Sequence, residues 1–289
     1  MDFSYDIGWL PNKIKFEKIL EIYKAVGINT IAYNFQCINN LSELLEPTRY
    51  IDKACELKDI FNTYKITCNQ TYAPFSLKLC DERCNCFEES YGQLVRALEF
   101  SAKIGAQQMV VYAVQVPGTI DQKDKNYKIY SSLIPFCKEF GIRLAICSDF
   151  PKYIKSSVLK TPWATAEEYR DFIMSFNSEY ICACLDLCSA AELQTTPEEF
   201  ILAVGSNHLK SIHFQDSEKY RDIHLKSFKE QFDLKAITKK LEQTGYEGEF
   251  TFEGPVFVQN YPIELLSALA ELLADIGYYV TGNFGGHKI

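Results

Sequence analysis

The feature that most constrains this chain is a regular alternation of short apolar runs with longer amphipathic segments. The apolar runs are rich in Val, Ile, Tyr, Phe and Thr, the residue types that favour β-strands. We expect each run to form one strand of a sheet. The runs occupy residues 4–9, 29–35, 66–75, 108–114, 143–150, 181–187, 210–216 and 249–255.

The segments between the runs have helical periodicity. Residues 15–27, 90–106 and 233–248 each place a glycine at or near the end of an amphipathic pattern, where helices commonly stop. Residues 196–205 open with Thr-Pro-Glu-Glu, an N-cap signal with proline at the first helical position. A last helix is expected over residues 262–280.

About eight strand–helix pairs in 289 residues match the usual size of a (β/α)8 barrel. A doubly wound open sheet is the alternative, but it more often has a glycine-rich phosphate turn after its first strand, and DIGWLPNK has none. No linker-like stretch divides the chain. The sequence therefore predicts an α/β fold, a single-domain (β/α)8 TIM barrel over residues 1–289.

Charge and cysteine usage limit the partners. A net charge of −8 lacks the basic surface of a nucleic-acid binder. No stretch reaches the roughly 18 apolar residues of a membrane span, and no signal segment is evident. Eleven cysteines without a signal segment predict reduced thiols in a cytoplasmic protein. We expect a small-molecule partner, no nucleic acid and no membrane, with a homo-oligomer left open.

Potential ligands and acid–base groups gather at the carboxyl ends of the last four strands. The fifth run ends in Cys147-Ser148-Asp149, the sixth reaches Asp186, the seventh carries His213 and the eighth reaches Glu253. In a barrel these strand ends meet in one ring, where the chemistry is expected. Each residue alone could be a cap or a packed core residue. Together, an Asp, a His and a Glu from consecutive strands favour a divalent cation.

These segments resemble the xylose isomerase-like barrel superfamily, which includes sugar-phosphate isomerases and epimerases, ketose 3-epimerases and endonuclease IV-type repair enzymes. The resemblance covers essentially the whole chain and implies a TIM barrel that acts on a sugar or sugar phosphate. It is carried by NQTYAPF (69–75), GIRLAI (141–146), LD (185–186), IHFQD (212–216) and FEGP (252–255).

The resemblance implies a divalent cation, Zn, Mn or Mg, held by side chains of the last four strands. Asp186, His213 and Glu253 match the family pattern, but Cys147 stands where a glutamate is usual. Cys147 could be a metal ligand, a base or a packed thiol. Asp149 lies two residues further on, so it would share a strand face with Cys147 and could take its place.

Other positions depart from the family pattern. Tyr72 and Tyr112 stand where many relatives have metal-binding histidines, and Ser189 stands where the sixth strand would supply another. Asp222 and His224 resemble a pair that holds a further metal in the repair enzymes, but Ser189 leaves that site short of a ligand. We therefore place Tyr72, Tyr112, Ser189 and His224 with the substrate-binding candidates.

The resemblance implies an isomerase or epimerase that moves a proton next to a carbonyl, with one group removing the proton and another returning it. Glu253 is the first candidate for this role and Cys147 the second. The alternative is a catalytically degenerate barrel that binds a sugar-like ligand or a protein partner without turnover, which the altered family positions favour. A metal-dependent dehydratase or lyase is a third hypothesis.

Overall fold

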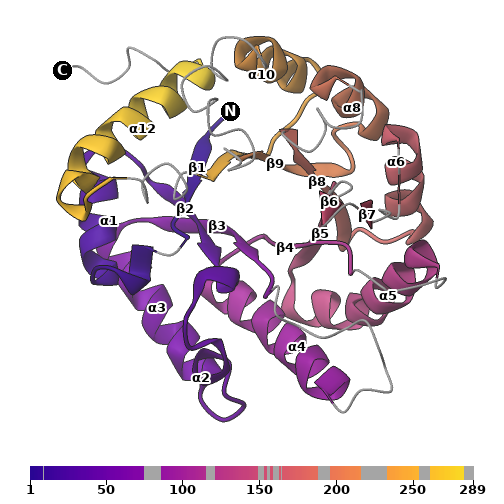
Figure 1. Ribbon diagram of the computed structural model, residues 1–289, viewed down its shortest axis with the longest axis horizontal. Helices are drawn as coiled ribbons and strands as arrows, with labels where there is room; N and C mark the ends of the chain where they lie inside the picture. Colours follow the sequence, from indigo (N-terminus) through magenta and orange to yellow (C-terminus); the bar gives the residue numbers. More distant parts are fainter. Residues whose placement is uncertain are drawn as a thin grey trace.

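Eight parallel strands close into a barrel in the computed structural model, which describes residues 1–8, 10–74, 86–114, 121–148, 153–154, 157–158, 163, 165–187, 196–215, 233–253 and 261–282. Their order around the barrel is β1-β10-β9-β8-β5-β4-β3-β2 (Figure 1). Each predicted apolar run overlaps one strand. The strands are β1 (Phe3–Asp6), β2 (Thr30–Asn34), β3 (Thr67–Tyr72), β4 (Gln108–Val111), β5 (Arg143–Cys147), β8 (Ile181–Asp186), β9 (Leu209–Gln215) and β10 (Phe250–Glu253).

Helices surround the barrel as an outer ring (Figure 1). The five helices expected from the sequence are present as α1, α4, α8, α10 and α12. The described helices are α1 (Phe16–Ala25), α2 (Leu41–Leu44), α3 (Tyr50–Tyr64), α4 (Cys86–Ile104), α5 (Gln122–Phe140), α6 (Ala166–Ser175), α8 (Pro197–Val204), α10 (Leu234–Gln243) and α12 (Leu266–Val280), with the 3-10 turns η1 (Leu10–Asn12), η2 (Phe35–Cys37) and η4 (Ile263–Leu265).

The strand pairing confirms the predicted TIM barrel and excludes the open sheet. Strand β1 pairs in parallel with both β2 and β10, so the sheet has no edge. The hydroxyl oxygens of Ser4 and Thr251 lie 2.8 Å apart across this closing pair. Among the described strands, the short pair β6 (Tyr153–Ile154) and β7 (Ser157–Val158) was not predicted; these two strands are antiparallel and follow β5. The helices α2, α3, α5 and α6 were not predicted individually either.

Local sequence signals fix the helix that precedes β9. The side chain of Thr196 accepts a hydrogen bond from the backbone N–H of Glu199, and the Glu199 carboxylate accepts one from the backbone of Thr196. Pro197 follows at the first helical position, so this is the capping box that the sequence predicted. The next strand, β9, carries His213 into the barrel.

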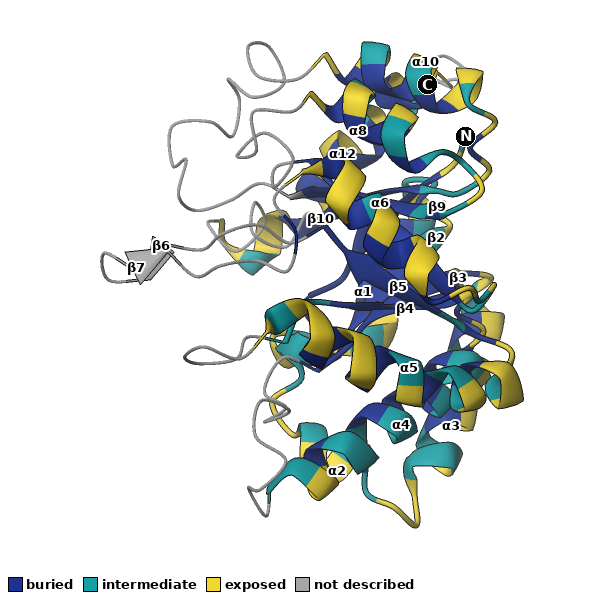
Figure 2. Ribbon diagram, turned by 90° about the vertical axis from the view of Figure 1, so that its right-hand side faces the viewer, coloured by how far each residue is buried: buried dark blue, intermediate teal, exposed yellow. Residues whose placement is uncertain are grey.

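Strand alternation divides the apolar residues into two cores. The large core lies between the strands and the surrounding helices, and buried residues run through the middle of the molecule (Figure 2). The small core fills the barrel interior. It consists of Ala32, Tyr72, Val110, Ala145, Cys147, Cys182 and Cys184.

A register shift changes which residues of β3 face the interior. The pairing of β2 with β3 slips between Ile31 and Ala32. Ile31 pairs with Cys68 and Ala32 pairs with Gln70, so Asn69 is an extra residue in β3. Asn69 Nδ2 contacts Ser4 Oγ at 3.2 Å, and Gln70 contacts His213 across the barrel. Two consecutive residues of β3 therefore both reach interior groups.

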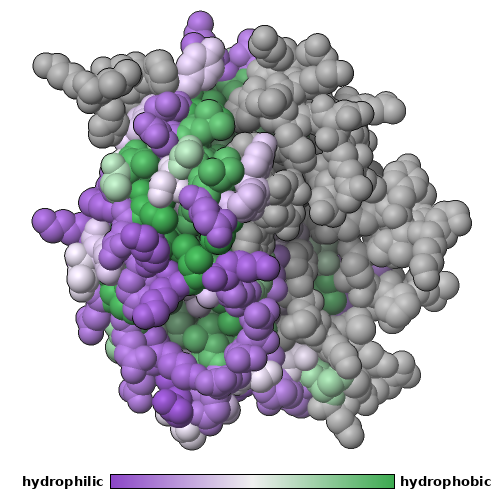
Figure 3. Space-filling model, turned by 60° about the vertical axis from the view of Figure 1, so that its left-hand side comes forward, coloured by the Kyte–Doolittle hydropathy of each residue, from purple (hydrophilic) through white to green (hydrophobic). Residues whose placement is uncertain are grey.

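The outer surface has an apolar strip beside its hydrophilic groups. Figure 3 shows apolar side chains gathered in a band on the side where α1 and α12 lie in Figure 1. Leu265, Leu272 and Tyr279 are exposed and recur every seven residues along η4 and α12. The possible homo-oligomer stays a prediction, since this strip alone does not identify a partner.

Candidate functional site

The predicted site residues lie at the carboxyl ends of consecutive barrel strands. Cys147 is the last residue of β5, Asp186 the last of β8 and Glu253 the last of β10. His213 lies near the end of β9. All four are buried, because the closed barrel turns these strand positions toward its interior.

Gln70 contacts the ring of His213, and Ser211 holds the Gln70 amide in place. Nε2 of His213 lies 2.7 Å from Nε2 of Gln70, and Ser211 Oγ donates to Gln70 Oε1 at 2.5 Å. Nδ1 has no hydrogen-bond partner among the described residues, although Glu253 Oε1 lies 3.4 Å from it. The imidazole is therefore fixed on one side and presents an unsatisfied buried nitrogen on the other.

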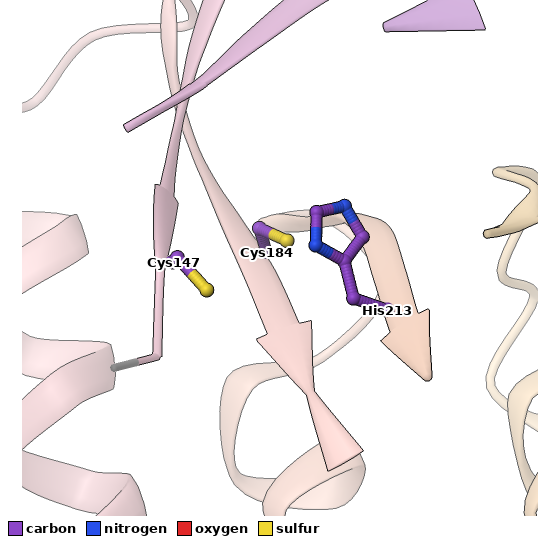
Figure 4. A group of neighbouring side chains, drawn as sticks. All are labelled: Cys147, Cys184 and His213. Atoms are coloured by element: carbon purple, nitrogen blue, oxygen red, sulfur yellow. The ribbon is translucent and has the colours of Figure 1, made fainter. Parts of the chain in front are cut away.

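A compact group of potential metal ligands surrounds this histidine. The ligand atoms of Cys147, Cys184 and His213 all lie within 4.8 Å of one another, and all three residues are 0 % exposed. Figure 4 shows that they come from three neighbouring strands and that the thiol of Cys184 points toward the imidazole ring. Cys147 and Cys184 are paired in register across β5 and β8.

Cys184 is a site residue that the sequence analysis missed. The signal was present: in ICACLD, Cys184 stands two residues before Asp186, so both belong to the same face of the strand. A cysteine inside an apolar run is usually a packed side chain. Only the approach of β5 and β9 gives this one its polar neighbours.

Electrostatics favour a thiolate at Cys184. Burial raises its pKa, but the neighbouring side chains of Cys147, His213 and Ser211 lower it to about 6. Burial lowers the pKa of His213, but Cys184 and Glu253 together raise it well above its usual value. The thiol of Cys184 and the imidazole of His213 therefore each favour the charged form of the other.

Asp6, at the end of β1, is a second residue that the sequence analysis missed. Its carboxylate accepts hydrogen bonds from the Gly8 backbone at 2.7 Å and from Asn34 Nδ2 at 2.9 Å. Burial and the nearby Glu253 raise its pKa to about 7, while Asn34, Gly8 and His213 lower it. Asp6 thus belongs to the same electrostatic site as Glu253.

The donor set fits a divalent cation. Asp6, Asp186 and Glu253 are buried carboxyl groups at strand ends, and His213 offers an orphaned Nδ1 beside Glu253. Buried carboxylates need a compensating cation or hydrogen bonds. Oxygen, nitrogen and thiolate donors together suit zinc most directly.

The other predicted substrate-binding residues have different outcomes. Tyr72 and Tyr112 lie in or against the interior core, and the Tyr72 ring is 5.0 Å from the His213 ring. Burial, followed by Glu253, raises the pKa of both tyrosines well above the usual value. Ser189 and His224 lie outside the described residues, as do Asp149 and Asp222.

The expectation of reduced thiols holds for seven described cysteines: Cys37, Cys55, Cys68, Cys137, Cys147, Cys182 and Cys184. Cys86, the first residue of α4, is disulfide-bonded instead. The prediction was therefore wrong for Cys86. The thiols that face the barrel interior are unaffected by this correction.

The amino end of the barrel has a different cavity of about 230 Å³. Three buried polar atoms at this cavity have no hydrogen-bond partner within the described part of the chain: Asn69 Oδ1, Arg143 Nε and Glu249 Oε2. Burial and Asp2 raise the pKa of Glu249 to about 7, while Ser4 lowers it. The cavity is lined by Asn69, Gln107, Gln108, Arg143, Lys210, Glu247, Gly248 and Glu249.

Comparison with known proteins relates this geometry to a family. The family model for xylose isomerase-like TIM barrels matches residues 20–275. None of the curated proteins matches the sequence. Among the described residues, no helix is long and apolar enough to cross a membrane.

Solved structures share the fold at low sequence identity. A D-psicose 3-epimerase studied in the presence of D-fructose has a TM-score of 0.74 and 15% identity, covering 98% of this chain and 100% of its own. The IOLI protein with a bound zinc atom has a TM-score of 0.72 and 13% identity, covering 99% and 100%. The 3-keto-D-glucoside 4-epimerase YcjR from E. coli has a TM-score of 0.69 and 15% identity, covering 94% of this chain and 98% of its own.

Proposed function

Because this chain belongs to the xylose isomerase-like TIM barrel family, we propose that it is a divalent-cation-dependent isomerase or epimerase of a sugar or sugar phosphate. The observation that carries the proposal is the orphaned Nδ1 of His213, which lies 3.4 Å from Glu253 Oε1 in a ring of buried carboxyl groups. Such a ring is suited to a cation and to proton transfer at the same place.

The residues proposed to hold the cation are His213, Cys147, Asp186 and Glu253. Gln70 would keep the imidazole in position, since it contacts the other ring nitrogen, and Ser211 in turn holds the Gln70 amide. A cation bound there would polarise a sugar carbonyl and stabilise the negative charge that develops beside it. Zinc, manganese and magnesium are the ions to test.

Glu253 is the proposed acid–base group. Its carboxylate would take the proton from the carbon next to the carbonyl, and a second group would return a proton to complete the isomerisation or epimerisation. Cys147 is the proposed second group, with Asp6 and Asp186 as further carboxyl groups of the same site. Tyr72, Tyr112, Ser189 and His224 are proposed to contact the substrate.

The structural relatives support a sugar-like substrate. The neighbours include a D-psicose 3-epimerase with D-fructose and a D-allulose 3-epimerase with D-allulose. A cytoplasmic location is part of the proposal and is supported by the seven reduced thiols.

The experiment is solvent hydrogen exchange. The protein, supplied with zinc, manganese or magnesium, is incubated in D₂O with D-fructose, D-psicose, D-tagatose and their phosphates, and NMR follows deuterium entry next to the carbonyl. We expect exchange with at least one sugar and a loss of about 100- to 10,000-fold in Glu253→Gln. The matched control is Glu249→Gln, which changes a glutamate at the opposite end of β10. Exchange that persists unchanged in Glu253→Gln would contradict its role.

A catalytically degenerate barrel is the second candidate function. It is favoured by the packing of Tyr72 and Cys147 in the interior apolar core. This candidate predicts no exchange with any sugar of the panel and sugar binding that chelators leave unchanged, which calorimetry measures.

A further inference from the structure

Within the proposed site, the positions of the thiols distinguish two ways of holding a cation. Cys147 and Cys184 belong to neighbouring strands, and both thiols approach His213. The carboxylates of Asp186 and Glu253 lie at the last residues of their strands. On β8, Asp186 is two residues, about 6.6 Å of strand, beyond Cys184.

The three-residue group is already close to the dimensions of a metal site. In tetrahedral zinc sites, with Zn–S of about 2.3 Å and Zn–N of about 2.0 Å, neighbouring ligand atoms are roughly 3.5 to 3.8 Å apart. The ligand atoms of Cys147, Cys184 and His213 lie within 4.8 Å of one another. A shift of little more than about 1 Å would complete the geometry, which small side-chain rotations supply.

The imidazole is prepared for binding through Nδ1. That nitrogen has no hydrogen-bond partner among the described residues, whereas Nε2 is held by Gln70. Binding through Nδ1 puts the ring proton on Nε2, which then needs an acceptor. A half-turn of the Gln70 amide supplies its oxygen, and the Ser211 hydroxyl can accept from the amide nitrogen.

We infer that Cys147, Cys184 and His213 form a two-thiolate, one-imidazole site for zinc or a similarly thiophilic cation. Two sulfur ligands disfavour magnesium and manganese, which prefer oxygen. Three protein ligands leave a fourth position for water or substrate, as catalytic zinc sites do. Asp186 and Glu253 would then be available for proton transfer and substrate contact. The inference rests on the proposed function and revises its ligand set, with Cys184 in place of Asp186 and Glu253, but it does not require turnover.

Cobalt substitution tests the inference without an activity assay. Metal-free, reduced protein is incubated anaerobically with Co²⁺ until its absorbance is constant, and the sulfur-to-cobalt charge-transfer band is recorded. Wild-type protein should show a band of two-thiolate intensity. Cys184→Ser and Cys147→Ser should each lose about half of it, in proportion to the thiolates removed. Cys182→Ser is the matched control, because Cys182 is a buried cysteine of the same strand.

Zinc affinity, measured by competition with a chelating dye, gives a second readout. Cys184→Ser should weaken Zn²⁺ binding by at least about 100-fold, beyond the effect of a typical outer ligand partner. Cys182→Ser should bind like wild type. A wild-type cobalt complex without a sulfur band, or failure of wild-type protein to bind either ion, would overturn the inference even if Cys184→Ser failed to fold. If the sulfur band forms but no sugar exchanges deuterium, the proposed function fails and the metal site stands.

Discussion

The two ends of the barrel differ in how their charged groups are compensated. At the amino end, Arg143 and Lys210 line the same cavity as Glu247 and Glu249. At the carboxyl end, the charges include the carboxyl groups of Asp6, Asp186 and Glu253, with His213 among them. Mixed charges can compensate one another through a few waters, and a cavity of about 230 Å³ has room for them.

The two ends differ in what would satisfy their unpartnered polar atoms. Both ends contain buried polar atoms that have no hydrogen-bond partner among the residues that the structure describes, such as Arg143 Nε at one end and His213 Nδ1 at the other. At the carboxyl end the excess of acidic groups calls for an added cation. Two residues report on this contrast: Glu249 and Asp6, each with its pKa raised to about 7.

The largest expected effect comes from His213. His213→Ala should abolish zinc binding and deuterium exchange, because it removes the nitrogen on which the site is centred. Arg143→Gln at the amino end should retain both. Elemental mass spectrometry and the D₂O assay measure the outcome, and His213→Gln, which keeps more of the side-chain volume, checks that a loss is not a packing effect. Zinc retained at one equivalent in both histidine variants would break the comparison.

Zinc should stabilise the folded chain through the carboxyl end alone. At a free concentration of 100 times its dissociation constant, an ion raises the free energy of unfolding by about 2.7 kcal/mol. Urea unfolding should show this gain in wild type and in Arg143→Gln, and a much smaller gain in Cys184→Ser at the same zinc concentration. An equal gain in Cys184→Ser would mean that zinc is held elsewhere.

Gln70 sharpens the comparison further. Gln70→Leu should weaken zinc binding by about 10- to 100-fold, or roughly 1.4 to 2.7 kcal/mol, because the His213 ring loses the partner of Nε2. Gln108→Leu is the matched control: Gln108 is the register partner of Gln70 on β4, is also buried, and lines the cavity at the amino end. The dye competition assay should find its affinity unchanged, and equal losses in both variants would point to general loosening of the barrel.

The smallest expected effect is on the pH dependence of the free energy of unfolding. The pKa of Asp6 is about 7 in the folded chain, whereas its pKa in the unfolded chain is near 3.8. Between these values the unfolded state binds fewer protons, so Asp6 makes the free energy of unfolding fall as pH rises, by at most about 1.4 kcal/mol per pH unit. Above about pH 7 its contribution is constant.

Unfolding at a series of pH values measures this slope. Asp6→Asn and Glu249→Gln should each reduce it in metal-free protein. Zinc should remove the contribution of Asp6 to the pH dependence of the free energy of unfolding, because a cation beside Glu253 lowers the pKa of Asp6. It should leave the contribution of Glu249, at the opposite end, unchanged. If zinc changed the contributions of both Asp6 and Glu249, the two ends would not be electrostatically separate.

The barrel and part of the candidate site could be predicted from the sequence. Eight apolar runs at regular intervals predict the strands, and parallel strand ends necessarily meet, which brings Asp186, His213 and Glu253 to one end. Cys184 could have been predicted from its place two residues before Asp186. The contact of Gln70 with His213 could not, because it depends on the slipped register between β2 and β3 and on the curvature that brings opposite strands together.

Complete burial of Cys147 and Cys184 has a consequence for how quickly the site can be filled. Both thiols are 0 % exposed once the barrel is closed, and closure joins β1 to β10, whose Ser4 and Thr251 are 247 positions apart in the chain. During synthesis, β5 and β8 are complete before β10 emerges, so an open sheet would offer these thiols to solvent for a time. An ion present then would be captured as the barrel closes, whereas an ion added later would have to pass between packed side chains. Loading during refolding should therefore be faster than loading of the folded chain.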